Sequence, residues 1–181
     1  MQAKEPHSGV DERERPLLLV DIDGVISLFG GWTGLGADGG QRTDGALHSI
    51  EGMLHFLSFT AAAHLLELSS EYELVWASGW EERADEYLPH LLGLPRGLPF
   101  LRFQRAVGRS HAHWKLDAID AYCAGRPLAW IDDALDDACR GWAQARSSTA
   151  PTLLVQTNPR RGLTGREAAL LSGWALELRA A

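Results

Sequence analysis

A buried-strand pattern that ends in two carboxylates constrains the fold of this chain more than any other feature. Residues 17–20 are four consecutive aliphatic residues, and the sequence Asp-Ile-Asp-Gly-Val, which begins at Asp21, follows them directly. Such an unbroken run is typical of a strand buried on both faces, as in a parallel sheet covered by helices. In open α/β sheets of this kind, ligands bind at the carboxyl ends of the strands. We therefore expect Asp21 and Asp23 to lie at the ligand-binding edge.

Strands and helices alternate along the rest of the chain, which predicts a doubly wound α/β domain. With 45% apolar residues in a chain of 181, one domain with a substantial core is expected. The other expected strands are residues 73–77, 127–131 and 151–156, with 99–103 at the edge of the sheet. The expected helices are residues 60–69, 81–92, 113–123, a stretch from about 136, and a last one that a capping box opens at 164–179.

The expected domain organisation is a disordered tail followed by a single domain. Residues 1–15 have almost no apolar content and cannot bury enough surface to offset the entropy of ordering. Residues 16–181 then form the α/β domain. Within it, residues 29–40 are rich in glycine and residues 46–59 favour a hairpin. A glycine-rich flap is therefore expected at about residues 26–59.

The charge distribution argues against broad, sequence-independent binding of nucleic acid. The formal net charge is −7, whereas such binding needs a basic surface. Residues 88–116 nevertheless contain no acidic residue, which indicates either a positive rim over an anionic substrate or an ordinary solvated surface. The basic residues of this stretch are Arg96, Arg102, Arg105, Arg109 and Lys115.

The sequence also carries expectations about location. No apolar run approaches the roughly 20 residues needed to span a bilayer, and residues 1–15 lack the apolar region of a signal peptide. The two cysteines, Cys123 and Cys139, have neither zinc-type nor Cys-x-x-Cys spacing, so reduced core thiols are expected. A cytoplasmic protein without a membrane partner is the resulting prediction.

A second strand end carries groups that suit an anion. The expected strand 73–77 is followed by Ser78, Gly79 and Trp80 and then by a charged helix. A hydroxyl group, a glycine amide and a helix N-terminus together offer hydrogen-bond donors and a positive dipole to a phosphoryl group. Alternatively, Ser78 only caps the helix and Trp80 only packs it onto the sheet.

Four carboxylates follow the expected strand 127–131. They repel one another unless a cation or a helix N-terminus offsets their charge, and capping a helix needs only one of them. The cluster therefore indicates more than a structural cap. Its members are Asp132, Asp133, Asp136 and Asp137.

The order of these motifs resembles the haloacid-dehalogenase-like (HAD) superfamily of phosphohydrolases. Asp-x-Asp-Gly-Val comes first, then Ser78 after a strand, Lys115 before the next buried strand, and Asp-Asp-x-x-x-Asp from Asp132. The resemblance covers residues 17–156. It implies a Rossmann-like, doubly wound, mainly parallel five-stranded sheet of order 3-2-1-4-5, with helices on both faces. It also implies a Mg²⁺ ion and an aspartyl-phosphate intermediate.

The resemblance assigns roles to the acids. Asp21 is implied as the nucleophile and as a metal ligand, and Asp133 as a further ligand. Asp23 is implied to bind the metal through its backbone carbonyl, while its carboxyl group acts as acid and then as base. Asp132 and Asp137 are implied to support the metal ligands without binding the ion. Because the last motif can be aligned in two ways, Asp136 also stays open as a supporting residue.

The resemblance also assigns the groups that hold the phosphoryl oxygens. Lys115 is implied to neutralise the nucleophile and these oxygens, and Ser78 with nearby amides to hold them in the transition state. Substrate contacts are therefore expected from Ser78, Gly79, Trp80 and Lys115. The commonest residue at position 78 in the superfamily is Thr, and Ser keeps the hydroxyl group.

The carboxyl group two residues after the nucleophile indicates the reaction. A carboxylic acid there can protonate a leaving alcohol and then activate water. This predicts a Mg²⁺-dependent phosphomonoester hydrolase and disfavours dehalogenation, in which no leaving oxygen needs a proton. The alternatives are a non-catalytic phospho-ligand or protein-binding module on the same fold, and a phosphotransferase.

The lengths of the loops around the site bear on the substrate. Only about 35 residues separate Val25 from the helix expected at Thr60, and 36 separate Ser78 from Lys115, so no large cap domain is expected. An open or flap-covered site suits a phosphorylated small molecule or an exposed phosphoester. Nucleic-acid ends are possible but not favoured on this evidence, and the oligomeric state is left open.

Overall fold

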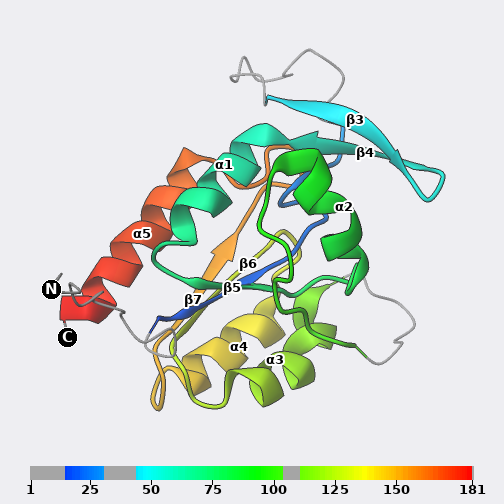
Figure 1. Ribbon diagram of the computed structural model, residues 1–181. Coiled ribbons are helices and arrows are strands. Elements are labelled where there is room, and N and C mark those ends of the chain that lie inside the picture. Colours follow the sequence, from blue (N-terminus) through cyan, green and yellow to red (C-terminus); the bar gives the residue numbers. More distant parts are fainter. Residues whose placement is uncertain (1–14, 31–43, 104–110, 181) are drawn as a thin grey trace, which may run out of the picture.

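The computed structural model describes residues 15–30, 44–103 and 111–180 (Figure 1). The predicted tail lies outside the described residues except for Arg15, and so does most of the glycine-rich stretch, at 31–43. The predictions that concern these segments therefore stay predictions.

A parallel sheet forms the centre of the fold. Its order is β5-β1-β6-β7, and β1 pairs in register with both neighbours, since Leu17 lies opposite Glu73 on one side and Leu128 on the other. The strand that carries the Asp-x-Asp motif is thus an inner strand. The strands are β1 (Leu17–Val20), β5 (Glu73–Trp76), β6 (Leu128–Asp132) and β7 (Thr152–Gln156).

The predicted five-stranded sheet is not confirmed, because the expected edge strand pairs at only one residue. Phe100 forms an isolated parallel bridge with Trp76, through hydrogen bonds from Trp76 N to Pro99 O (2.8 Å) and from Leu101 N to Trp76 O (2.9 Å). Pro99 has no N–H to extend this pairing. Phe103 N donates instead to the Glu81 carboxylate (3.0 Å), which takes the chain away from the sheet. The other four strands keep the relative order that was predicted for them.

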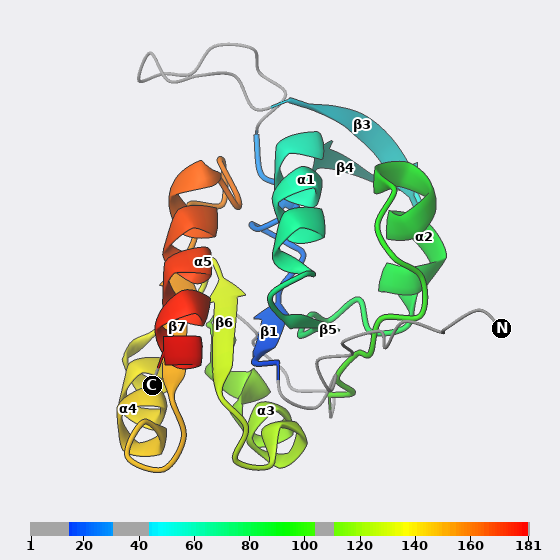
Figure 2. The same cartoon turned by 60° about the vertical axis from the view of Figure 1, so that its left-hand side comes forward.

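Helices cover both faces of the sheet (Figures 1 and 2). A 3₁₀ turn, η2, precedes α3, so Lys115 closes that turn instead of standing in the first turn of an α-helix as predicted. None of the described helices is both long and apolar enough to cross a membrane. The helical elements are α1 (Phe59–Leu68), α2 (Arg83–Leu92), η2 (Ala112–Lys115), α3 (Leu116–Cys123), α4 (Asp137–Arg146) and α5 (Gly165–Ala180).

Alternate side chains of β1 enter two separate hydrophobic clusters. Leu18 and Val20 pack with residues of α1, α2 and α5, whereas Leu17 and Leu19 pack with residues of α3 and α4. All four side chains are fully buried, and burying each contributes roughly 1.5–3 kcal/mol. The unbroken aliphatic run therefore has the cause inferred from the sequence, since both faces of the strand are covered.

The helix ends show local capping, partly at unexpected residues. The capping box of α5 is confirmed, because Thr164 N donates to the Glu167 carboxylate (3.1 Å) and Arg166 N donates to Thr164 Oγ1 (3.3 Å). The cap of α1 is Ser58, whose hydroxyl group accepts from Ala61 N (3.1 Å). Thr60, where the helix was expected to begin, lies inside it. Hydrogen bonding by a small polar side chain just before the first turn explains both caps.

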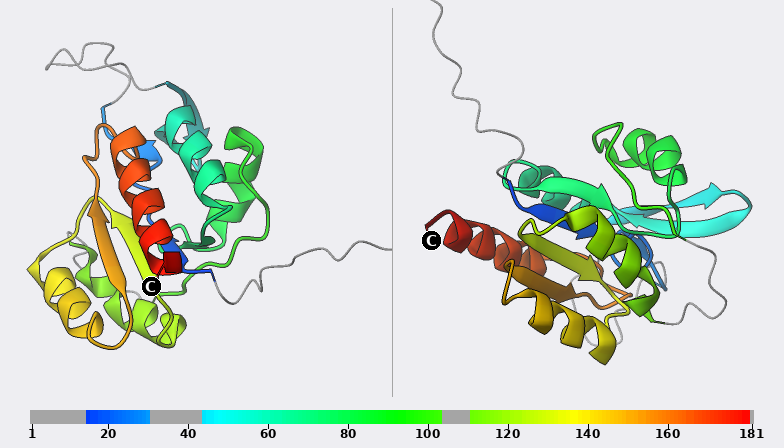
Figure 3. Two further views of the ribbon diagram at one scale, coloured as in Figure 1. Left: turned by 90° about the vertical axis from the view of Figure 1, so that its left-hand side faces the viewer. Right: turned by 90° about the horizontal axis from the view of Figure 1, so that it is seen from below.

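A small antiparallel sheet of order β2-β4-β3 stands beside the main sheet and confirms the predicted hairpin. Its turn is Glu51-Gly52, where φ is 50° and 81°, as in the two-residue type I′ turns that match the twist of paired strands. The hairpin extends away from the core near α2 (Figure 3). The strands are β2 (Ser27–Leu28), β3 (Gly45–Ile50) and β4 (Met53–Ser58).

Candidate functional site

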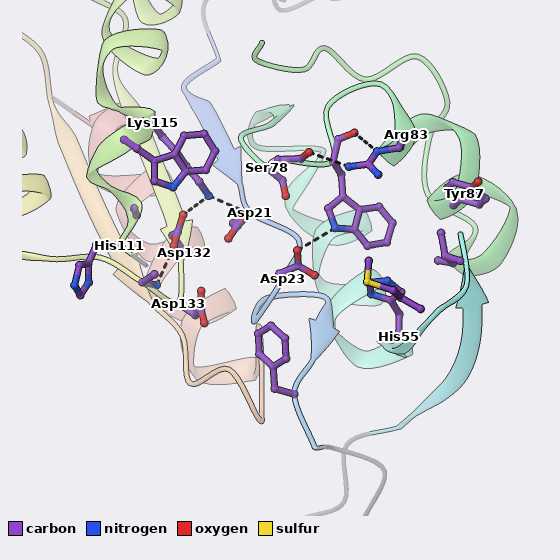
Figure 4. Close-up of a pocket in the computed structure, with 18 of the residues that line it drawn as sticks. Asp21, Asp23, His55, Ser78, Arg83, Tyr87, His111, Lys115, Asp132 and Asp133 are labelled. Carbon is purple, nitrogen blue, oxygen red and sulfur yellow. Dashed lines mark hydrogen bonds and ion pairs between the residues drawn. The ribbon is translucent and has the colours of Figure 1, made fainter. Parts of the chain in front are cut away.

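A pocket of about 430 Å³ lies at the carboxyl ends of β1, β5 and β6 (Figure 4). It combines the predicted site residues with residues of the hairpin, α2 and the segment around η2. The flap-covered alternative for this site stays a prediction, because residues 31–43 lie outside the described residues. The predicted site residues that line it are Asp21, Asp23, Ser78, Gly79, Trp80, Lys115, Asp132 and Asp133.

A tight turn after β1 presents the two acids of the Asp-x-Asp motif. The carbonyl oxygen of Ile22 accepts hydrogen bonds from the three amides of residues 25–27 at 2.8–3.2 Å. Asp21 is buried at 7% exposure. The Asp23 carboxylate accepts a hydrogen bond from Trp80 Nε1 (3.0 Å). Burial and then the charge of Asp21 raise the pKa of Asp23, against the opposing effect of this hydrogen bond.

Lys115 joins two of the acids. Its Nζ lies 3.0 Å from Asp21 Oδ1 and 2.6 Å from Asp132 Oδ2, and the residue is 3% exposed. Burial alone lowers the pKa of Lys115, but the charges of Asp21 and Asp132 outweigh burial, so the pKa is raised and the amine stays protonated. A fixed positive charge therefore stands beside the predicted nucleophile.

Asp132 and Asp133 are adjacent in sequence but differ in their partners. The oxygens of Asp132 both accept hydrogen bonds, Oδ2 from Lys115 (2.6 Å) and Oδ1 from Ala134 N (2.9 Å). Burial and the charge of Asp21 raise the pKa of Asp132, and the same two causes raise the pKa of Asp133 to about 6. Asp133 is only partly buried and faces the pocket. Asp132 thus holds Lys115, and Asp133 is the more open acid.

The donor set fits a divalent cation. Asp21, Asp132 and Asp133 each offer a carboxylate oxygen, and these oxygens lie within 4.8 Å of one another. The single ammonium group of Lys115 cannot offset three carboxylates, so negative charge remains for a cation. Carboxylate oxygens are hard ligands of the kind that Mg²⁺ prefers. The cluster is therefore suited to hold a divalent cation, with Asp132 the least available ligand because both of its oxygens already accept hydrogen bonds.

Gly24 permits the close approach of Asp133 to the turn after β1. Its φ is +75°, and a Cβ at this position would lie 2.3 Å from Asp133 Cγ. A side chain would therefore be strained in its backbone and would also displace the Asp133 carboxylate. The third residue after Asp21 is glycine for this reason.

We expect Gly24→Ala to weaken metal binding as well as the fold. The strained backbone should reduce the free energy of unfolding by about 1 kcal/mol or more, and the displaced Asp133 should reduce Mg²⁺ affinity. Denaturant unfolding and calorimetric titration of Mg²⁺ measure the two effects. Gly125→Ala is the matched control, because Gly125 also has a positive φ (+80°) but a Cβ added there would meet no atom within 4 Å. Equal Mg²⁺ affinity in both variants would contradict the role given to Gly24.

The Ser78 segment reaches the pocket, but the helix after it starts later than predicted. Ser78 is buried at 1% exposure and lines the pocket with Gly79. α2 begins at Arg83, and Glu81 in the intervening turn has a φ of 49°. The helix therefore begins about two residues later than expected, and its convergence with Ser78 stays a prediction. The turn residues Ser78 and Gly79 lie at the strand end and line the pocket.

The acids after β6 divide into two groups, which corrects one prediction. Asp136 caps α4 by accepting from Cys139 N (3.1 Å) and pairs with His113 (2.5 Å); the His113 hydrogen bond holds the pKa of Asp136 below its usual range. Asp137 has a fully exposed side chain and contacts Arg140 (3.4 Å). Neither acid lines the pocket. Asp137 therefore does not support the metal ligands, because the start of the helix turns it toward solvent.

The predicted basic rim is only partly described. Arg105 and Arg109 lie outside the described residues. Arg102 is 69% exposed in its side chain and lies 3.6 Å from the Glu82 carboxylate, and Arg96 contacts His90 (3.0 Å). Of the Arg and Lys residues in this stretch that the structure describes, Lys115 alone lines the pocket, and His111 lines it as well. The solvated-surface alternative therefore accounts for Arg96 and Arg102.

Sequence reasoning missed the residues that form the wall opposite Lys115. His55 Nδ1 forms a hydrogen bond with Ser27 Oγ (2.9 Å). Its ring packs edge-on against Trp80, with 4.9 Å between the ring centroids. Tyr87 and Arg83 line the same side from α2. The hairpin pattern was a signal that this wall exists, but no local motif marked its pocket-facing residues.

Comparison with known proteins bears on identity. A family model described as "HAD domain in Swiss Army Knife RNA repair proteins" matches residues 17–168. No curated protein matches the chain. The matched segment runs from the start of β1 into α5 and includes every acid that the pocket brings together. Proteins of the HAD superfamily are typically metal-dependent and act on phosphate esters. The chain therefore belongs to the family of HAD domains found in Swiss Army Knife RNA repair proteins.

Proposed function

We propose that the protein is a Mg²⁺-dependent phosphomonoester hydrolase that acts through an aspartyl-phosphate intermediate, with phosphorylated RNA ends as its substrates. The observation that carries this proposal is the position of Asp21. Its buried carboxylate lies 3.0 Å from Lys115 Nζ and within 4.8 Å of the oxygens of two further aspartates. A carboxylate in such surroundings can approach a phosphate dianion once its own charge is offset.

In the first step, a carboxylate oxygen of Asp21 forms a bond to phosphorus while the bond from phosphorus to the leaving oxygen breaks. Asp23 gives its proton to that leaving oxygen, so an alcohol departs. Burial and the charge of Asp21 raise the pKa of Asp23, which favours the protonated form that this step requires. Lys115 stays beside Asp21 and stabilises the phosphoryl oxygens, with Ser78 on the other side.

In the second step, a water molecule attacks phosphorus and Asp23 accepts its proton. The bond between phosphorus and Asp21 breaks, inorganic phosphate leaves, and both carboxyl groups return to their starting states. Mg²⁺, when bound, offsets the charge of the carboxylates and polarises the phosphoryl group. Asp21, Asp133 and the backbone carbonyl of Asp23 are the proposed ligands, and Asp132 holds Lys115.

The family description changes the order of candidate substrates. Net charge alone ranked nucleic-acid ends below small molecules, because a chain of charge −7 gains little from the phosphate backbone. An enzyme that processes a chain end needs only the terminal phosphate and its nucleoside, however, so a basic surface is not required. Because the family description names RNA repair proteins, we place phosphorylated RNA ends first among the exposed phosphoesters.

The test is phosphate release from a panel of substrates, each with Mg²⁺ and with chelator. The panel comprises RNA oligonucleotides phosphorylated at the 3′ or 5′ end, mononucleotides and glycerol phosphate. Release from RNA ends that stops with chelator is the expected result. Stoichiometric binding without release would instead support a binding module, and transfer of phosphate to an alcohol acceptor would support a phosphotransferase.

A stability measurement tests the metal site independently of activity. Mg²⁺ that binds the folded state alone should raise its stability by about 2.7 kcal/mol at a concentration 100 times Kd. Thermal unfolding with and without Mg²⁺ measures this effect. An unfolding temperature that does not respond to Mg²⁺, with no binding by calorimetry, would rule out the proposed ligands.

A further inference from the structure

The pocket has two chemically different halves that meet at Asp23. Figure 4 shows Lys115, Asp132 and Asp133 on one side of Asp21 and Asp23, with Arg83, Tyr87 and His55 on the other. The first half holds the charged groups of the proposed reaction, with the Trp114 ring beside Lys115. The second half, which we call the hairpin-side subsite, is mainly aromatic and apolar, with the ion pair of Glu51 and Arg83 at its rim. Its other lining residues are Ile50, Met53, His55, Trp80 and Tyr87.

The position of Asp23 indicates what enters the hairpin-side subsite. In the proposed reaction Asp23 passes its proton to the leaving oxygen, so the leaving group has to lie next to Asp23. The Asp23 carboxylate is bound by Trp80 Nε1 (3.0 Å), and Trp80 in turn packs against His55. The leaving group therefore extends along the aromatic wall, away from Lys115.

The charged groups at the rim of the subsite are already engaged with each other. Arg83 Nη1 lies 2.7 Å from the Glu51 carboxylate at the hairpin turn. Its other nitrogens donate to the backbone carbonyls of Gly79 (3.1 Å) and Trp80 (3.3 Å). Arg83 thus joins the tip of the hairpin to the Ser78 turn and lines the pocket between them. Because Arg83 already has these partners, it would add little binding energy for a second phosphate group of the substrate. A flat, weakly polar group suits the space better.

We propose that the hairpin-side subsite binds the terminal nucleoside of an unpaired RNA end, with its base against Tyr87 and Met53. This inference rests on the proposed function. A volume of about 430 Å³ is at the lower end of small-ligand pockets and suits one nucleotide, not a base pair. Proteins that act on single-stranded RNA ends splay out a base and stack it on aromatic side chains. Tyr87 is half-buried and Met53 is exposed, so both side chains have accessible surface for contact with a base.

The hairpin provides a matched pair of variants for the test. Met53 and Leu54 are neighbours on β4 and are 61% and 74% exposed. Successive strand residues point to opposite faces, and of the two only Met53 lines the pocket. Met53→Ala and Leu54→Ala therefore remove similar apolar surface from the two faces of one strand. Tyr87→Ala tests the wall formed by α2.

The experiment compares kcat/KM for three substrates with Mg²⁺. They are a 3′- or 5′-phosphorylated single-stranded RNA, the same RNA with an abasic terminal nucleotide, and glycerol phosphate. Removing one stacking partner of a base should lower kcat/KM for the intact end about tenfold. Tyr87→Ala and Met53→Ala should leave the abasic end and glycerol phosphate within about twofold of wild type. Leu54→Ala should leave all three unchanged, and wild type should prefer an unpaired end to a blunt duplex.

Three other outcomes would overturn the subsite inference or the proposed function, and they distinguish the one failure from the other. If Tyr87→Ala and Met53→Ala slow all three substrates equally, the residues are structural and not a base subsite. If wild type treats intact and abasic ends alike, no base is bound. If no substrate in the set, glycerol phosphate included, is hydrolysed, the proposed function fails. Binding of the same RNAs by fluorescence anisotropy then decides the subsite, and equal affinity for intact and abasic ends overturns it.

Discussion

Asp21→Asn should reduce Mg²⁺-dependent phosphate release by at least about 10⁴-fold while the protein stays folded. The amide keeps the shape of the side chain but is neither a nucleophile nor a good metal ligand. Lys115 retains Asp132 as its partner at 2.6 Å, so no buried charge is left alone. The loss of one like charge from the acid cluster should keep the unfolding temperature in chelator at or above that of wild type.

The matched control for this variant is Asp137→Asn. It makes the same chemical change at an acid whose side chain is fully exposed and pairs only with Arg140 in the described contacts. Activity within about twofold of wild type is expected there, as for a surface substitution. Mg²⁺ should raise the unfolding temperature of the control but raise that of Asp21→Asn much less. Appreciable metal-dependent turnover by purified Asp21→Asn would overturn the assignment of the nucleophile.

Asp23→Ala should slow formation of the aspartyl-phosphate by about 10²–10⁴-fold for an alkyl phosphate. An alkoxide is a poor leaving group without a proton, whereas an activated aryl oxide leaves readily. An aryl phosphate should therefore lose much less in this step. The aspartyl-phosphate formed from either substrate should also be hydrolysed slowly, because Asp23 is no longer present to accept the proton of the attacking water.

Single-turnover measurements of phospho-enzyme formation are needed here, since slow breakdown would hide the difference between substrates. Asp23→Asn is the companion variant, because its amide oxygen can still accept the hydrogen bond that Trp80 Nε1 gives to Asp23 (3.0 Å). It should show the same difference between substrates as Asp23→Ala. Equal losses for alkyl and aryl phosphates, or a collapse of Mg²⁺ affinity, would show that Asp23 is structural or purely electrostatic.

The parts of the fold that follow from short-range patterns could be predicted from the sequence. A four-residue aliphatic run requires cover on both faces, and β1 has that cover in two hydrophobic clusters. The ends of parallel strands meet at one edge, so Asp21, Ser78 and Asp133 were expected together, and all three line one pocket. Here the position along the chain determines the position in space.

The direction of individual side chains near helix starts could not be predicted in the same way. Asp136 and Asp137 are neighbours, yet Asp136 turns back to cap α4 while Asp137 points to solvent. The sequence contains no signal for this difference, because either acid is acceptable as a cap. The edge strand expected at residues 99–103 could not be predicted reliably either. Its residues favour a strand, but Phe103 N donates to the distant Glu81 carboxylate instead of to a neighbouring strand.

The hairpin-side subsite depends on contacts between segments far apart in sequence. Glu51 and Arg83 are separated by 32 positions, and their ion pair joins the hairpin turn to α2 beside this space. Periodicity within either segment cannot reveal that Tyr87 faces this space. The subsite therefore depends on tertiary contacts that no local sequence pattern encodes.

The central position of β1 has a consequence for the timing of amide exchange. Both edges of this strand are hydrogen-bonded, to β5 and to β6, so its amides should exchange with deuterium only at global unfolding. The β3 edge of the hairpin is paired on one side alone, and its amides should exchange through small local openings. Asp21 thus directly follows an inner strand of the main sheet, whereas the pocket wall formed by the hairpin is expected to open at lower free energy along its β3 edge. Hydrogen exchange should therefore show β3 amides exchanging on a timescale at which the amides of β1, which precedes Asp21, remain protected.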